Sequence, residues 1–134
     1  MKMKKGFKQM VDEAKARIST LSLADAKTRL GKEGTVFVDL RDVRELEREG
    51  QIPGAFHCPR GMLEFWLDPD SPYAKPIFQE GKEFVFFCNA SWRSALAADT
   101  AQQMGLENVH EMDGGFTAWK SAGFPVEARE KKKA

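Results

Sequence analysis

Two short apolar runs constrain the fold of this chain more than any other feature of its sequence. The run Phe84-Val85-Phe86-Phe87 places apolar side chains on both faces of an extended segment, and Val36-Phe37-Val38 has the same character. A strand without polar alternation is buried on both sides, as strands are in a parallel sheet covered by helices. We therefore expect an α/β domain with a central, mainly parallel β-sheet flanked by helices.

Segments with helical periodicity or helix-forming composition alternate with these two strands along the chain. The spacing of apolar residues and the positions of capping residues predict helices over 6–17, 23–30, 43–49 and 92–104, and a last helix from 116 onward. Further short strands are expected near 55–57 and 108–110. The proline-containing stretch 59–81 is expected to be irregular, with one helical turn at 62–66, and the charged end from Glu127 to be frayed.

Length, charge and cysteine content exclude several classes of protein. A chain of 134 residues corresponds to one domain, and 21 basic against 20 acidic residues give no basic excess for nucleic acid or an anionic membrane. No apolar run suits a secretion signal or a membrane span. Two cysteines, Cys58 and Cys88, do not make a disulfide framework. These features favour a cytoplasmic protein whose thiols stay reduced.

Cys88 is the residue best placed for chemistry, because it stands at the carboxyl end of the predicted strand 84–87. In open α/β sheets, ligands bind outside this edge. A tight loop that enters the helix 92–104 presents several backbone N–H groups, and the helix dipole and Arg93 add positive charge. Such a site favours an anion and the thiolate, so we expect a nucleophilic cysteine that carries a group. The alternative is that Cys88 is simply a small buried apolar residue.

The segment Cys88–Ser94 resembles the active-site loop of the rhodanese-like sulfurtransferase family. Two further sets of segments resemble that family's upstream and downstream signatures, in the family's order and spacing: Val38–Asp42 with Glu45 and Gly50–Ala55, then Gly114–Trp119 with Ala122–Val126. The resemblance covers residues 20–127. It therefore implies a rhodanese-like domain over 20–127, an N-terminal helical extension over 1–19 and a basic tail over 128–134.

The resemblance also implies a reaction and a site. The Cys88 thiolate would attack the outer sulfur of a small anionic donor such as thiosulfate, and a thiol or protein acceptor would then take the sulfur from the Cys88 persulfide. The loop residues would bind the donor and the persulfide, largely through backbone amides: Asn89, Ala90, Ser91, Trp92, Arg93 and Ser94. The family needs no metal or organic cofactor, and the spacing of the histidines and cysteines is not that of a zinc site.

Two rival functions remain open at this point. Phosphatase and arsenate-reductase relatives carry five residues between the cysteine and the arginine, whereas four separate Cys88 from Arg93, which favours sulfur over phosphate. The second rival is a sulfur-sensing or protein-binding module without turnover. The N-terminal helix suits a docking surface or a homodimer contact as well as a cover for the core.

One loop position departs from the family, because many members carry glycine where this chain has Ser91. If that position needs a positive φ, serine is strained there; alternatively, its hydroxyl would hold the persulfide or the donor.

Several other polar residues are expected to be structural. Asp39 and Arg41 are predicted to form a buried, hydrogen-bonded charge pair with a structural role at the end of a strand. Cys58 is expected to be a packed core residue rather than a resolving thiol for Cys88. Trp66 and Trp119 are expected in the core.

Overall fold

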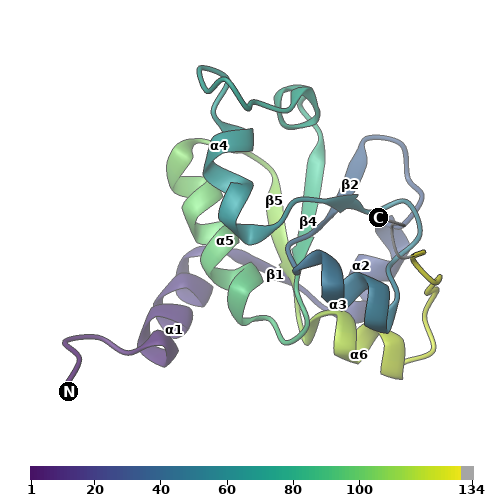
Figure 1. Cartoon of the computed structure of the whole chain (residues 1–134), viewed down its shortest axis with the longest axis horizontal. Helices are drawn as coiled ribbons and strands as arrows, with labels where there is room; N and C mark the ends of the chain where they lie inside the picture. Colours follow the sequence, from purple (N-terminus) through teal and green to yellow (C-terminus); the bar gives the residue numbers. More distant parts are fainter. Residues whose placement is uncertain (131–134) are drawn as a thin grey trace.

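The computed structural model describes residues 1–130, and within them the strands form one five-stranded sheet whose pairings are all parallel (Figure 1). The strand order is β1-β5-β4-β2-β3, which places β4 at the centre of the sheet. The strands are β1 (Ser19–Leu21), β2 (Thr35–Asp39), β3 (Phe56–His57), β4 (Glu83–Phe87) and β5 (Val109–Met112). The predicted α/β class with a parallel central sheet is confirmed.

Helices cover both faces of this sheet. They are α1 (Phe7–Arg17), α2 (Leu23–Arg29), α3 (Val43–Glu49), α4 (Leu63–Leu67), α5 (Trp92–Met104) and α6 (Gly115–Ser121), with short 3₁₀ helices at Arg60–Met62 and Pro76–Gln79. In Figure 1, α1, α4 and α5 lie on one side of the strands, and α2, α3 and α6 lie on the other. The stretch 59–81 therefore holds more regular structure than the single helical turn expected there.

After its first residue, Glu83, the central strand β4 has only apolar residues, and the structure shows why. Phe84 and Phe86 enter the apolar core under α4 and α5, whereas Val85 and Phe87 enter the second core with Phe116 and Trp119. All four residues of the run are at most 1% exposed. The continuous apolar pattern therefore reflects burial on both faces.

The N-terminal helix α1 packs beside α5 rather than against the sheet. Val11 and Ala14 are buried in a small cluster with Ala95 of α5. At the start of α1, the ring of Phe7 lies 5.1 Å from the ring of Trp92, the first residue of α5. The helical extension thus reaches the loop that follows β4.

Four details depart from the sequence predictions or refine them. β1 was not predicted, although it pairs in parallel with β5 along the edge of the sheet. Glu127 is not frayed, because its backbone exchanges two hydrogen bonds of 2.9 Å with Gln51. Trp119 is fully buried, as expected, but Trp66 is only half-buried. The last part of the predicted basic tail, residues 131–134, lies outside the described residues.

Candidate active site

Cys88 follows directly after β4 and lies beside the first turn of α5. Its side chain is only 1% exposed. The sulfur accepts a hydrogen bond from the backbone amide of Ser94 at 3.4 Å, and the thiol donates to the Ser94 hydroxyl, also at 3.4 Å. The sulfur is therefore buried but lies in a polar environment at the N-terminal end of a 13-residue helix.

The loop backbone turns its carbonyl groups toward the start of α6. The amides of Phe116 and Thr117 donate to the carbonyl oxygens of Cys88 and Asn89, at 2.7 and 3.2 Å. Within the described residues, the amides of residues 89–93 donate no hydrogen bond. A row of unpaired N–H groups beside a helix N-terminus is an arrangement suited to an anion.

Gly115 makes this close approach of α6 and the loop possible. A Cβ atom at Gly115 would lie 2.4 Å from the carbonyl oxygen of Cys88 and 2.6 Å from that of Asn89. The residue also has a φ of +62°, which residues other than glycine rarely adopt. Gly115 therefore lets the start of α6 pack directly against the backbone of the loop.

Arg93 is held in place by a carboxylate from another helix. Its two terminal nitrogens donate to the two carboxylate oxygens of Glu45 on α3, at 2.7 and 2.9 Å. Glu45 is the main cause that raises the pKa of Arg93, and the nearby Cys88 adds to it; the hydrogen bond from Arg93 lowers the pKa of Glu45. Arg93 thus anchors the loop to α3 while its charge remains close to the sulfur.

The side chain of Asn89 completes the connection between the loop and the sheet. Its amide nitrogen donates to Glu45 and Glu49 at 2.9 and 3.0 Å, and its oxygen accepts from Arg41 at 3.3 Å. Arg41 is fully buried and pairs with Asp39 at 2.8 Å. Asp39 and Arg41 accordingly form the buried structural pair that the sequence predicted.

Ser91 has a left-handed backbone, with φ +73°. Its hydroxyl donates to the carboxylate of Glu111 and lies 3.1 Å from the carbonyl oxygen of Met112. The turn therefore does need a positive φ. The hydroxyl is engaged inside the domain and is not free to hold a donor or a persulfide, so only the Ser91 amide remains for that task.

The remaining loop residues differ in their exposure to solvent. Ala90 and Trp92 are exposed, with Trp92 at 52%, whereas the Ser94 side chain is buried against the sulfur. The structure therefore brings all six predicted binding residues around one short loop but gives them different environments.

Two acidic residues of the site were missed as site residues. Glu45 was noted only as part of the upstream motif, and its pairing with Arg93 depends on the parallel arrangement of β2 and β4. Glu111 lies in β5 and is fully buried beside Ser91 and Ser94. The one sequence signal for Glu111 is a charged residue directly after the predicted strand 108–110 and shortly before the Gly114-Gly115 pair.

Cys58, the second cysteine, is fully buried in the apolar core under α4. Burial raises the pKa of its thiol to about 12, so the thiol keeps its proton. Among residues 1–130, no cluster of three or more His, Cys, Asp or Glu side chains is arranged to hold a metal ion.

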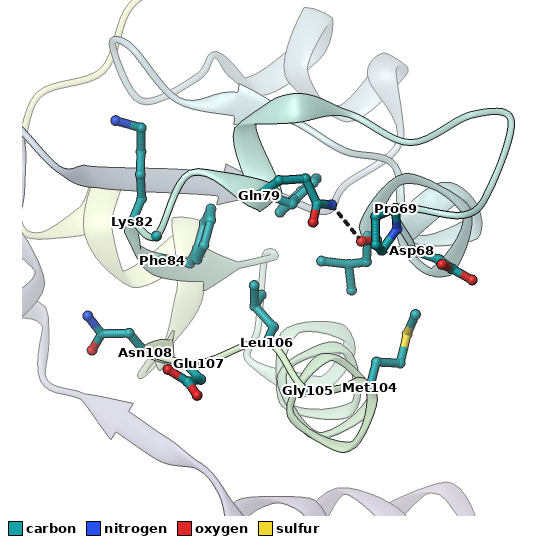
Figure 2. Close-up of a pocket in the computed structure, with 13 residues that line it drawn as sticks. Asp68, Pro69, Gln79, Lys82, Phe84, Met104, Gly105, Leu106, Glu107 and Asn108 are labelled. Carbon is teal, nitrogen blue, oxygen red and sulfur yellow. Dashed lines mark hydrogen bonds between the residues drawn. The ribbon is translucent and has the colours of Figure 1, made fainter.

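A cavity of about 590 Å³ lies at the end of the sheet where β4 and β5 begin, opposite the end that carries Cys88 (Figure 2). It is lined by Lys82 and Phe84 at the start of β4 and by Leu106 and Asn108 before β5, and the Gln79 amide donates to the carbonyl of Leu67 on its wall at 2.8 Å. Because Cys88 stands at the carboxyl end of β4, this cavity is separate from the cysteine loop.

This fold, with a cysteine loop at the carboxyl end of the central strand, is found among known proteins. The chain belongs to the rhodanese-like domain family, whose model matches residues 22–122. The predicted resemblance is therefore confirmed. None of the helices in the described part of the chain combines the length and the apolar character needed to cross a membrane.

Individual relatives place the chain within this family. It is 30% identical to the thiosulfate sulfurtransferase GlpE of Pseudoalteromonas translucida over 102 residues, which cover 76% of this chain and 89% of that protein. A solved structure from Rhodopseudomonas palustris, of a protein of unknown function called a possible tyrosine phosphatase, is 57% identical, with a TM-score of 0.92 and coverage of 95% and 98%. The homodimeric polysulfide-sulfur transferase of Wolinella succinogenes is 30% identical, with a TM-score of 0.70 and coverage of 92% and 88%.

Proposed function

We propose that the chain is a sulfurtransferase that carries sulfane sulfur as a persulfide on Cys88. The observation that carries the proposal is the position of the Cys88 sulfur at the N-terminus of α5, where it accepts from the Ser94 amide and begins a loop whose amides at 89–93 donate no hydrogen bond within the described residues. A persulfide is an anionic group one sulfur atom longer than a thiolate, and these amides would stabilise its terminal sulfur.

The reaction would proceed in two half-reactions. The Cys88 thiolate attacks the outer sulfur of thiosulfate, a sulfur–sulfur bond forms, and sulfite leaves with the electron pair of the bond that breaks. An acceptor thiolate then attacks the outer sulfur of the persulfide, and Cys88 leaves as thiolate. Arg93, fixed by Glu45, would offset the negative charge of donor and sulfur in both steps.

The relatives support this chemistry and define its alternatives. Two of them are named as transferases of sulfur from thiosulfate or polysulfide, which supports a small anionic donor. The 57% identical protein is called a possible tyrosine phosphatase, which keeps phosphate chemistry as the rival. The loop argues for sulfur, because only four residues separate Cys88 from Arg93 and its curvature depends on a tight left-handed turn at Ser91.

The surface beside the loop suits a protein that accepts the sulfur, and it equally suits a protein that binds without any sulfur transfer. The exposed rings of Trp92 and Phe7 lie beside the loop and offer an apolar contact for a protein that brings its own thiol or only binds. One of the relatives is a homodimer, so a second copy of this chain is another candidate partner. We propose that the reaction takes place in the cytoplasm, where free thiols such as that of Cys88 stay reduced.

Incubation of the reduced chain with thiosulfate tests the proposal directly. We expect intact-protein mass spectrometry to show the gain of one sulfur atom, and an equal amount of sulfite to be released. A dithiol acceptor should then remove the added sulfur, and the chain should load and release sulfur again over many cycles while thiosulfate is present. Release of phosphate from an aryl phosphate, without any gain of sulfur, would instead establish the phosphatase. Loading without turnover to any acceptor would establish a sulfur sensor.

Substitution of Ser91 by glycine should preserve or raise the rate of sulfur loading. Glycine adopts the observed φ of +73° without strain, and the amide at this position is retained. The measurement is sulfite release over time, compared with the wild-type chain. A loss of tenfold or more would mean that the bonds from the Ser91 hydroxyl to Glu111 and Met112 hold the loop in its working shape.

A further inference from the structure

Glu111 is a buried acid that the proposed reaction does not yet use. Its side chain is fully buried, and its Oε1 atom accepts hydrogen bonds from the hydroxyls of Ser91 and Ser94, the latter at 2.9 Å. Its Oε2 atom has no hydrogen-bond partner within the described residues. A carboxylate with one oxygen unpaired in the interior is costly, so this position favours the neutral acid.

Ser94 connects this acid to the nucleophile. Its hydroxyl oxygen lies 3.4 Å from the Cys88 sulfur and 2.9 Å from Oε1 of Glu111. A hydroxyl group has a single proton, so it can donate either to the carboxyl group or to the sulfur. The direction of the Ser94 O–H bond is therefore tied to which of the two groups carries the negative charge.

We propose that Cys88 and Glu111 share one proton through Ser94, so that Glu111 is the neutral acid whenever Cys88 is the thiolate. This inference rests on the proposed function and makes Glu111 a positioning residue for it. The S–H bond of Cys88 breaks and its proton passes to the Ser94 oxygen, while Ser94 gives its own proton to Oε1 of Glu111. The negative charge moves from the carboxylate to the sulfur, and no heavy atom has to move.

The groups around Glu111 support this distribution of charge. Burial is the largest influence on the pKa of Glu111 and raises it, and the hydrogen bonds from Ser91 and Ser94 oppose this effect. Lys15 of α1 is the nearby positive charge, and the Thr20 hydroxyl of β1 lies near the carboxyl group without forming a hydrogen bond in the structure.

The sulfur side of the network also offers groups that stabilise negative charge. Arg93 lies near the Cys88 sulfur, and the Ser94 amide donates to it. The sulfur can therefore hold the negative charge when Glu111 is the neutral acid.

This pairing has a consequence for the donor. Loss of the shared proton would leave two negative charges in one buried site, which opposes the approach of an anion such as thiosulfate. Sulfur loading should then fall about tenfold per pH unit above the pH at which Glu111 ionises, as for any group that must stay protonated.

Carbon-13 NMR of the reduced chain, with labels at Cys88 Cβ and Glu111 Cδ, tests the pairing without any sulfur donor. Across neutral pH, we expect Cys88 at its thiolate shift and Glu111 at its carboxylic-acid shift. In Cys88→Ser, which lacks the competing charge, Glu111 should ionise at a pH lower by at least about one unit, a tenfold change in proton affinity. In Ser94→Ala, the pH at which the Cys88 thiolate forms should be about one unit higher, because the sulfur loses a hydroxyl donor.

Glu83→Gln is the matched control, because it removes a partly exposed carboxylate at the far end of β4 and should leave both titrations unchanged. A Glu111 carboxylate that coexists with the Cys88 thiolate at neutral pH would overturn the inference. A Glu111 titration that stays unchanged in Cys88→Ser would also overturn it. Sulfite release is measured separately, so that an inactive chain with coupled titrations contradicts the proposed function alone.

Discussion

Replacing Cys88 by serine is expected to abolish sulfur loading completely. Serine fits the same space, but its hydroxyl is far less acidic than a thiol and forms no stable sulfur–sulfur bond. After treatment with thiosulfate, the wild-type chain should gain one sulfur atom by intact-protein mass spectrometry, and Cys88→Ser should gain none. The fold should persist, because the Ser94 amide can donate to oxygen as it does to sulfur.

Cys58→Ser provides the matched control for this experiment. Cys58 is fully buried in the apolar core, and its pKa of about 12 keeps the thiol protonated at neutral pH. The folded Cys58→Ser chain should therefore load sulfur as the wild type does. Loading that persists in Cys88→Ser and disappears in Cys58→Ser would move the nucleophile to Cys58 and refute the assignment of the loop.

Replacing Gly115 by alanine is expected to have the second largest effect. The added Cβ atom would lie 2.4 Å from the Cys88 carbonyl oxygen and 2.6 Å from that of Asn89, so the loop and α6 must separate. The positive φ and the forced separation together should lower the free energy of unfolding by roughly 2–5 kcal/mol. Sulfur loading should fall at least tenfold, because the carbonyls of the loop lose the amides of α6 that orient them. Denaturant unfolding and sulfite release measure the two effects.

Gly123→Ala separates the backbone strain from the contact. Gly123 follows the same helix and has a φ of +78°, but no atom lies within 4 Å of the position of an added Cβ. This variant should cost only about 1–2 kcal/mol, from the left-handed backbone alone, and should load sulfur normally. Equal losses of loading in the two variants would show that the contact at Gly115 does not matter for the loop.

The sequence predicted the α/β fold well because its strongest signals were local. The apolar runs of β2 and β4 and the periodic helix α5 carry their own patterns, and each lies within one residue of its predicted bounds. The edge strand β1 was missed because Ser19-Thr20-Leu21 is short, and its first two residues are exposed. Such a segment becomes a strand only through its pairing with β5, which sequence periodicity cannot show.

The candidate site was predictable only in part, for a similar reason. The loop residues 88–94 follow one another along the chain, so a strand end, a cysteine and an arginine identified them together. The partners that fix their environment come from distant segments. Glu45 reaches Arg93 from α3, and Glu111 reaches Ser91 and Ser94 from β5, and both contacts exist only after the sheet has formed.

The bonds from Phe116 and Thr117 to the carbonyls of Cys88 and Asn89 also bear on the order of events during synthesis. Cys88 precedes α6 by almost thirty residues, yet the amides that bind the carbonyls of its loop belong to α6. A ribosome-bound chain that ends before α6 therefore carries the cysteine without the hydrogen bonds that orient its loop. The proposed reactivity toward sulfur donors would then arise only after α6 has left the exit tunnel and docked against the loop.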